Sequence, residues 1–429
     1  MAAQIGMRMR FTDTEVLVIG AGPAGTFAAI RLASLGWQVT LVEQSRYPRQ
    51  KVCGECLGPA SLELLDEIGL GADVRRLAGP SIRQVGWAAA DRTIVAEMPA
   101  CVGSRYPHGC AIGRDILDSL LLERARSQGV DILQPVRVRR ISGVPGNLAC
   151  VCERRDDPLT HQRGHRREVV RAALVIDAHG SWERSFDGPI AAQSAHEEGA
   201  PRASDLLAFK ASFAGAALAP GVLPVLCLPG GYGGMVVSDR GRTTVAGCIR
   251  RETLRQWRAR ARGESAGEVV ETYLRSSCGL AATALHSAHR EGAWQAVGPL
   301  RTGYHPQSPW GILRIGNAAA EAHPLIGEGI CMALQSAAIL AGLCANRRRE
   351  LDAASIVDLQ RTHAALGRRE FSGRLRLARL YARIAMRPAP AAAAAILMRS
   401  WPRVLTSGAE LAGKARNGRP QFPARQALA

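Results

Sequence analysis

The sequence predicts an α/β fold with a second, α+β domain, and three observations support this prediction. A short β-branched strand, Val16 to Ile19, runs directly into a glycine-rich turn and a small-residue helix. A second glycine-rich turn, at residues 323–329, precedes a long apolar helix. Between them, many segments alternate polar and apolar residues as half-buried strands do. The 429 residues are enough for two domains and a sizeable core.

The first turn has the pattern of a dinucleotide-binding site. Gly20 allows the tight turn, Gly22 lets the backbone approach a pyrophosphate, and Gly25 lets the helix pack on the sheet. The free N–H groups at the helix start would face the phosphates. The next strand ends at Glu43, whose carboxylate can accept hydrogen bonds from ribose hydroxyls and disfavours a 2'-phosphate. The predicted contacts are Gly20, Gly22, Pro23, Ala24, Gly25 and Glu43.

The formal net charge is +18, and only three of the 55 basic residues are lysines. Such a charge attracts anionic cofactors, acidic polypeptides or anionic lipid. Basic runs interleaved with aromatic residues are absent from the sequence, so we expect no nucleic-acid binding. The eleven cysteines and the lack of a charged-then-apolar leader predict reduced thiols in a cytoplasm.

The loop after the second strand carries a family resemblance. Arg49, Lys51 and the run Cys53-Gly54-Glu55 follow the fingerprint. Together they resemble FAD-dependent oxidoreductases of the geranylgeranyl reductase, flavin halogenase and aromatic hydroxylase superfamily. The resemblance implies a Rossmann-like FAD-binding domain of the glutathione-reductase type, an inserted and mostly antiparallel substrate sheet, and a helical C-terminal tail. It also implies that Arg49, Lys51 and Gly54 contact FAD, although a solvated basic turn is the alternative.

The second glycine-rich segment resembles the strand-Gly-Asp and Pro-x-x-Gly-x-Gly motifs that close the FAD site in this superfamily. The helix start would stabilise the anionic reduced ring. Asn317 replaces the family aspartate, and its amide oxygen can still accept a ribityl hydroxyl, so we expect weaker FAD binding but not its loss. The FAD contacts implied here are Asn317, Pro324, Gly327, Gly329 and Ile330.

Two further positions follow from the resemblance. Asp177 and Gly180 match the second flavoprotein fingerprint, although His179 stands where the hydroxylases usually have aspartate. Arg114 begins an amphipathic helix, where the family has an arginine that can reach the phosphates, and a surface charge is the alternative.

The implied domain organisation is discontinuous. It assigns residues 11–80, 105–188 and 300–345 to the FAD-binding domain, 81–104 and 189–299 to the substrate domain, and 346–429 to a helical tail. A helix over 368–387 would place apolar residues on one side and four arginines on another. It could lie on an anionic membrane, cover a partner, or pack with its arginines in solvent. The apolar run 391–398 is too short to span a bilayer.

Several functions remain open. We rank first a monooxygenase that uses NAD(P)H and O2 to hydroxylate an aromatic or bulky hydrophobic substrate, for which a tryptophan in an acidic polypeptide is one candidate. A reductase of an unsaturated hydrophobic chain and a non-catalytic flavin-binding partner protein are the alternatives. A halogenase is disfavoured because Gly233-Gly234-Met235 follows Tyr232 in place of the tryptophan signature.

The catalytic candidates lie close to the expected ring position. They are His323, Glu328, Cys53 and Glu55, each of which could instead be structural. Cys53 and Cys56 form a CxxC pair without the second pair that a zinc site needs, so no metal is expected. A redox disulfide is also disfavoured, because flavin disulfide reductases use a wider spacing and a second nucleotide fingerprint.

Overall fold

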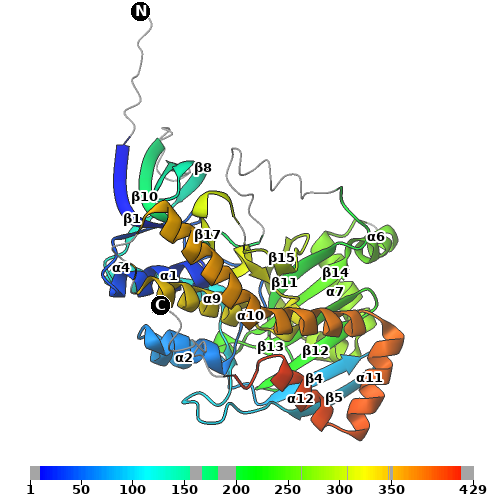
Figure 1. Cartoon of the computed structure of the whole chain (residues 1–429). Coiled ribbons are helices and arrows are strands. Elements are labelled where there is room, and N and C mark those ends of the chain that lie inside the picture. The colour runs from blue at the N-terminus through cyan, green and yellow to red at the C-terminus, as the bar shows by residue number, and fades with distance from the viewer. Residues whose placement is uncertain are drawn as a thin grey trace, which may run out of the picture.

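The computed structural model describes residues 10–154, 167–181, 200–261, 263–306, 308–345, 347 and 351–416. Figure 1 shows one sheet at the upper left, a second sheet at the right, and the long helix α10 running across the front of both. Short strands and helices connect these layers. They are β3 (Cys56–Leu57), β6 (Cys110–Ala111), β16 (Gly303–Tyr304), β18 (Ala320–Glu321), α2 (Pro59–Glu67), α3 (Gly71–Leu77) and η4 (Pro324–Ile326).

The first sheet has parallel strands at its centre, in the order β7-β2-β1-β10, with β9 and β8 added antiparallel and β17 paired to β10. Val16, Leu17 and Val18 are fully buried, as expected for a strand covered on both faces. Helices α1 and α9 pack against each other beside this sheet. The bounds are β1 (Arg10–Ile19), β2 (Val39–Val42), β7 (Asp131–Leu133), β8 (Val136–Val144), β9 (Asn147–Arg154), β10 (Arg167–Asp177), β17 (Leu313–Arg314), α1 (Pro23–Ser34), α4 (Arg114–Ser127) and α9 (Gly329–Cys344).

The second sheet has the order β15-β11-β14-β13-β12-β4-β5, and every pairing except β12 with β4 is antiparallel. Its strands come from residues 84–97 and 206–297, while the exact domain boundaries stay a prediction. The bounds are β4 (Gln84–Ala89), β5 (Arg92–Glu97), β11 (Leu206–Ala214), β12 (Val222–Leu228), β13 (Gly231–Val237), β14 (Thr243–Arg250) and β15 (His289–Val297). The two sheets confirm the predicted α/β fold with a second α+β domain.

The sequence also predicts one helix beside the second sheet, over residues 265–275, and the described residues 251–285, apart from 262, contain three. The predicted helix is α7 (Ala266–Ser277), which begins with a capping box between Ser265 and Glu268. The helices α6 (Arg251–Arg260) and α8 (Gly279–Leu285) were not predicted. In α6 only Leu254 is buried and half of the residues are charged, so the helix offers little apolar periodicity to recognise.

The C-terminal region is helical and covers both sheets. It consists of α10 (Ala353–Ala385), α11 (Pro388–Ser400) and α12 (Arg403–Leu411). The predicted helix over 368–387 is the second half of α10, which starts earlier because the Asp352 carboxylate caps it by accepting a hydrogen bond from Ser355 N at 2.8 Å. None of the described helices is long and apolar enough to cross a bilayer. The polar stretch from Glu153 to Arg167 predicts an exposed hairpin or loop, and its residues 155–166 lie outside the described residues.

Candidate flavin site

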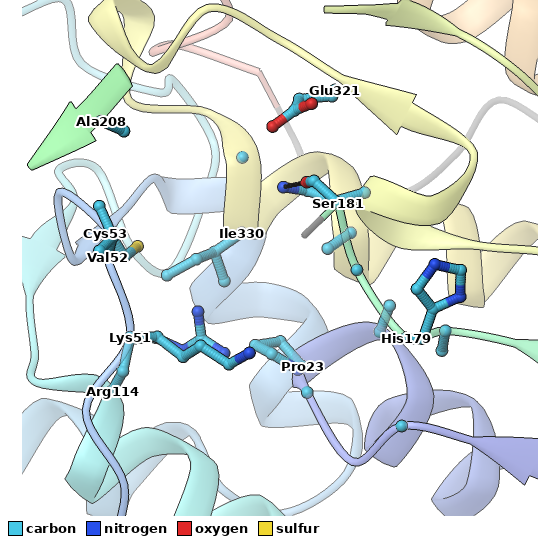
Figure 2. Close-up of a pocket in the computed structure, with 18 of the residues that line it drawn as sticks. Pro23, Lys51, Val52, Cys53, Arg114, His179, Ser181, Ala208, Glu321 and Ile330 are labelled. Carbon is cyan, nitrogen blue, oxygen red and sulfur yellow. Dashed lines mark hydrogen bonds between the residues drawn. The ribbon is translucent and has the colours of Figure 1, made fainter. Parts of the chain in front are cut away.

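One cavity lies where the first turn, the loop after β2, the second sheet and the segment before α9 meet. Its empty volume, including solvent at the mouth, is about 1680 Å³. Figure 2 shows Lys51, Arg114 and Pro23 at one end of this cavity and Glu321 at the other. The predicted residues that line it are Gly20, Gly22, Pro23, Ala24, Glu43, Arg49, Lys51, Cys53, Gly54, Glu55, Arg114, Gly180, Asn317, His323, Pro324, Gly327, Gly329 and Ile330.

The glycines of the first turn have three different environments. Gly20 has a φ of +101°, and a Cβ there would lie 2.6 Å from the Ala178 carbonyl oxygen. A Cβ on Gly25 would lie 1.9 Å from the Gly20 carbonyl oxygen, so Gly25 faces the protein and does not line the cavity. A Cβ on Gly22 would instead occupy the cavity, with no atom nearer than Arg114 Nη2 at 3.9 Å. Gly22 therefore keeps the space in front of α1 open for a ligand.

Two arginines face this space and are fixed by buried acids. The Arg114 guanidinium donates to both oxygens of Asp118, at 2.7 and 2.8 Å. Arg49 pairs with Glu43 at 3.0 Å and with Asp118 at 3.6 Å, and its Nη2 lies 4.0 Å from the position of a Gly22 Cβ. Rigid guanidinium groups opposite a helix start suit a pyrophosphate. The residues present therefore fit the phosphate end of FAD.

Glu43 lines the cavity and also accepts hydrogen bonds from two backbone N–H groups. One carboxylate oxygen accepts from Ala21 N at 2.9 Å, and the other accepts from Ser45 N at 2.7 Å. This buried carboxylate thus holds the backbone of the first turn as well as lining the cavity.

Asp177 does not line the cavity, although it was predicted to contact FAD. Its buried carboxylate hydrogen-bonds the ring of His179 and lies 3.6 Å from Arg314. Burial acts to raise the pKa of Asp177, but His179 and Arg314 outweigh it and lower the pKa. His179, Gly180 and Ser181 line the cavity in its place, so the role of Asp177 here is to fix the loop.

The two glycine-rich segments meet at the cavity. Gly316 has a φ of +60°, and a Cβ there would lie 2.7 Å from the Ala24 side chain at the start of α1. Asn317 donates from its amide to Ser181 Oγ at 3.0 Å. The sixteen-residue helix α9 then begins at Gly329, with Ile330 and Ala333 on the cavity wall. Two helix starts, those of α1 and α9, therefore face the same cavity.

Glu55 lines the cavity but has all its oxygens engaged. It accepts from Lys210 Nζ and from Thr244 Oγ1, and Arg114 N lies 3.3 Å from Oε1. Glu55 and Lys210 are each 2% exposed. This buried ion pair connects the loop after β2 to strand β11 of the second sheet.

Glu328 points away from the cavity, so its placement does not support a catalytic role. Its carboxylate is 1% exposed and forms ion pairs with Lys414 at 2.9 Å and with Arg374 at 3.8 Å. Lys414 also donates to the Gly327 carbonyl oxygen at 3.0 Å. The C-terminal tail thus supports the turn that precedes α9 from behind.

His323 and Cys53 do line the cavity. His323 Nδ1 lies 3.0 Å from the hydroxyl of the buried Tyr232. Burial, and then the nearby Arg379 and Arg383, lower the pKa of His323 to about 4, so its ring is neutral near pH 7. Cys53 and Cys56 are free thiols.

Glu321 is a cavity residue that the sequence reasoning missed. It is 4% exposed, and its Oε2 accepts from Arg301 N at 2.8 Å. Burial raises the pKa of this carboxyl to about 7. Figure 2 shows the carboxylate at the end of the cavity away from Pro23. The one sequence signal was an acid inside the otherwise apolar run Ala318 to Ala322.

The wall near Glu321 and His323 is apolar. It is formed by Ala208 and Phe209 of β11 and by Ala246, Gly247 and Cys248 of β14. Within the described residues, no three His, Cys, Asp or Glu side chains are grouped as metal ligands. This end of the cavity therefore combines a small-residue wall with one carboxyl and one neutral imidazole.

Known proteins with related sequences have several different activities. An FAD-dependent monooxygenase, ankC of Aspergillus thermomutatus, is 27% identical over 192 residues, which are 42% of this chain and 32% of that protein. A tryptophan 2-halogenase of Chondromyces crocatus is 29% identical over 130 residues, 30% of this chain and 24% of that protein. The menaquinone reductase of Mycobacterium tuberculosis is 33% identical over 125 residues, 28% of this chain and 29% of that protein. The chain thus spans about a third or less of the length of these relatives.

Solved structures share the fold. The flavin-dependent brominase Bmp2 superposes with a TM-score of 0.67 at 15% identity, covering 94% of each chain. Pseudomonas aeruginosa PqsL, solved in complex with 2-aminobenzoylacetate, superposes with a TM-score of 0.63 at 18% identity, covering 89% of this chain and 99% of its own.

The family model described as "FAD binding domain" matches residues 13–350, which include both glycine-rich segments and all strands of the second sheet. The resemblance to FAD-dependent oxidoreductases is thereby confirmed. The chain belongs to the family described as FAD binding domain.

Proposed function

We propose that the protein is a monooxygenase that uses FAD, NAD(P)H and O2 to hydroxylate an aromatic or bulky hydrophobic substrate. The observation that carries this proposal is the cavity end at which Glu321 and His323 face the apolar wall of β11 and β14. A mostly apolar pocket with a few polar groups is the usual form of a site for such a molecule. FAD, when bound, supplies the redox and oxygen chemistry.

The side chains at this end can accept or donate a proton. A carboxyl with a pKa near 7 exists in both protonation states at neutral pH, which suits a general acid or base. Glu321 would accept a proton from a phenolic hydroxyl or from an aromatic N–H group of the substrate. The neutral His323, held by Tyr232, can accept or donate a hydrogen bond beside it.

We assign the rest of the cavity to the cofactor. Arg49, Lys51 and Arg114 would bind the pyrophosphate in front of Gly22, and Glu43 would accept from the ribose. The segment from Asn317 to Ile330 would contact the ribityl chain and the ring. The eleven free thiols support a reducing compartment such as the cytoplasm.

The test is a stepwise reaction of the purified protein. Anaerobic addition of NADH or NADPH should bleach the bound flavin, and admission of ¹⁸O2 with phenols or indoles should place labelled oxygen in the product. Mass spectrometry of the products reads this out. Reduction by nicotinamide that yields no labelled product with any aromatic or hydrophobic compound would contradict hydroxylation.

A peptide-bound tryptophan belongs in the same substrate panel. The net charge of +18 would attract an acidic polypeptide. Acidic and basic peptides of equal length around one tryptophan would separate charge attraction from recognition of the indole.

A reductase of an unsaturated hydrophobic chain is the second candidate. Two observations favour it: the Cys53 thiol lines the cavity, and the 33% identical relative is a menaquinone reductase. Reduced flavin that persists in air until a polyene is added, with a product heavier by two hydrogens, would select this function. Failure of both nicotinamides to reduce the flavin would instead favour a non-catalytic flavin-binding partner.

A further inference from the structure

Helix α11 is apolar on both of its faces. Its thirteen residues carry one charge, that of Arg399. Ala391 and Ala395 are buried against the second sheet, and Trp87 Nε1 donates to the Ala391 carbonyl oxygen at 3.1 Å. On the outer face, Ile396 is 57% and Leu397 is 43% exposed. A helix that is apolar all round normally has both faces covered.

The exposed apolar surface continues on the neighbouring helices. Trp401 is 63% exposed, Val404 38% and Leu411 67%, while Leu405 and Ala409 anchor the other side of α12. Leu380 on α10 is 51% exposed. Within the described residues, six of the eleven exposed large hydrophobic side chains lie between positions 380 and 411. We call this set the C-terminal apolar patch: Leu380, Ile396, Leu397, Trp401, Val404 and Leu411.

The helices that carry the patch also carry exposed arginines. Between residues 376 and 411 the sequence has six arginines and one acid, Glu410. All six are exposed: Arg376, Arg379, Arg383, Arg387, Arg399 and Arg403. Isolated exposed hydrophobic residues need no explanation, but six of them on three successive, contacting helices that also carry exposed arginines indicate an interaction surface.

The charges decide between possible occupants. A second copy of this chain would bring its own arginines against these, which is unfavourable. Exposed tryptophan and leucine next to arginines are typical of helices that lie in the interface of an anionic bilayer. We propose that the C-terminal apolar patch docks the protein on an anionic membrane surface.

The docking helices are part of the cavity's support. Helix α10 contacts the Pro324–Ile326 turn, and Figure 1 shows α10, α11 and α12 following one another along the second sheet. The patch would thus lie on the same helical layer that packs behind the segment preceding α9. Membrane docking is compatible with either hydroxylation or reduction, so this proposal does not depend on which reaction the protein catalyses.

Vesicle flotation of the full-length, FAD-loaded protein tests the proposal. Vesicles of phosphatidylcholine with phosphatidylglycerol should carry the protein to the top of the gradient, and vesicles of phosphatidylcholine alone should carry much less. High salt should release it. The triple variant Ile396→Ser, Leu397→Ser, Trp401→Ser should lower the bound fraction about tenfold or more.

A matched control lies at the other end of the molecule. Val144 on β8 is 62% exposed, and Val144→Ser should bind anionic vesicles like the parent protein. Flavin absorbance and thermal unfolding would establish that each variant is folded. Arg399→Glu with Arg403→Glu keeps the apolar residues and should abolish the preference for anionic lipid.

Trp401 provides a direct signal. Its emission should shift to shorter wavelength on anionic vesicles, and the shift should be absent in Trp401→Phe. Absence of vesicle binding by the folded parent protein would overturn the proposal, as would a dimer in light scattering that the triple variant abolishes. Equal binding by the parent and the triple variant would also overturn it, because the patch would then not be the contact.

Discussion

Glu321 is an acid that the protein buries at the end of its cavity, and this burial makes stability depend on pH. Its pKa rises from 4.5 to about 7 on folding, so the folded state binds its proton more tightly than the unfolded state. The stabilising effect of that proton is fully present below pH 4.5 and is lost as pH rises through about 7. Above that pH the buried carboxylate costs about 3 kcal/mol, from a shift of about 1.4 kcal/mol per unit.

We therefore expect Glu321→Gln to be more stable than the parent apoprotein at pH 8 and nearly equal to it at pH 4.5. Gln retains an oxygen that can accept from Arg301 N. Urea unfolding of both proteins across this range measures the difference. A constant difference at all pH values would contradict the raised pKa. In turnover, the variant should lose the pH dependence that Glu321 imposes, whichever substrate is used.

The first turn offers a comparison between neighbouring glycines. Gly25→Ala places a Cβ 1.9 Å from a carbonyl oxygen, so we expect a loss of about 3 kcal/mol in unfolding free energy and no bound FAD. Gly22→Ala meets no atom within 3.9 Å and should cost less than about 1 kcal/mol, yet lower FAD affinity at least about tenfold, because the Cβ enters the cavity.

Gly373→Ala is the control for these two substitutions. Gly373 lies inside α10, and no atom lies within 4 Å of the position that a Cβ would take there. Alanine should therefore leave FAD binding unchanged and raise stability by up to about 1 kcal/mol. Thermal unfolding and flavin content give both quantities. Normal FAD binding by Gly22→Ala would contradict a pyrophosphate position in front of α1.

Among single residues, the sequence predicted the glycines better than the acids. A glycine's role follows from local backbone geometry, which a short motif reports. Glu321 and Glu328 stand seven residues apart in the same segment, and one lines the cavity whereas the other points away. That difference depends on Lys414 and Arg374, which lie far along the chain, so no local pattern could reveal it.

At the scale of elements, the turn before α9 depends on the tail behind it. Lys414→Met would remove the donor to the Gly327 carbonyl and the nearer of the two cations that pair with Glu328 among the described residues, which would keep Arg374 at 3.8 Å. Breaking a buried ion pair on one side costs about 3 to 5 kcal/mol. We expect such a loss, together with weaker FAD binding, because the turn that lines the cavity is no longer held.

The double variant Lys414→Met, Glu328→Gln separates the effect of the buried charge of Glu328 from the positioning of the Gly327 turn. It should recover much of the stability, since no unpaired carboxylate remains buried. FAD affinity should stay low, because the Gly327 carbonyl still lacks its donor. Calorimetry for stability and flavin titration for affinity measure the two effects. Unchanged FAD affinity in Lys414→Met would mean that the tail does not position the turn.

The elements themselves were predictable to different degrees. The strand, turn and helix at the N-terminus followed from β-branching, glycine spacing and a small-residue helix. For helix α10 the sequence predicted only the second half, where apolar residues and arginines alternate. The first half was not predicted, because its start depends on the cap at Asp352. Helix α11 was regarded as an apolar run too short to span a bilayer, and the exposure of its outer face became apparent only in the packed structure.

For the whole molecule, Glu55 and Lys210 connect the cofactor loop to the second sheet. Lys210→Met would leave the buried carboxylate of Glu55 without its lysine partner. We expect this substitution to lower the free energy of unfolding by about 3 to 5 kcal/mol. In this variant, urea should release the flavin at a lower concentration than the one at which the helical circular dichroism is lost. In the parent protein the two transitions should coincide. Coincident transitions in the variant would show that this pair does not couple the two parts; Lys210→Met with Glu55→Gln should restore coincidence.

The two-sheet architecture was predictable because two cofactor motifs in a fixed order constrain the chain between them. The cavity wall near Glu321 was not predictable, because it comes from separate strands, β11 and β14, and from β18. Ion pairs such as that between Glu55 and Lys210 join positions 155 residues apart and leave no periodic trace in the sequence.

The support of the Gly327 turn by Lys414 also bears on how the protein is made. The first turn, at Gly20, leaves the ribosome early, whereas Lys414 follows about 400 residues later. At about 5 to 20 residues per second, Lys414 is added roughly 20 to 80 s after Gly20, and until then it cannot support the Gly327 turn. We therefore expect stable loading of FAD only at the end of synthesis, after the tail has packed behind the turn.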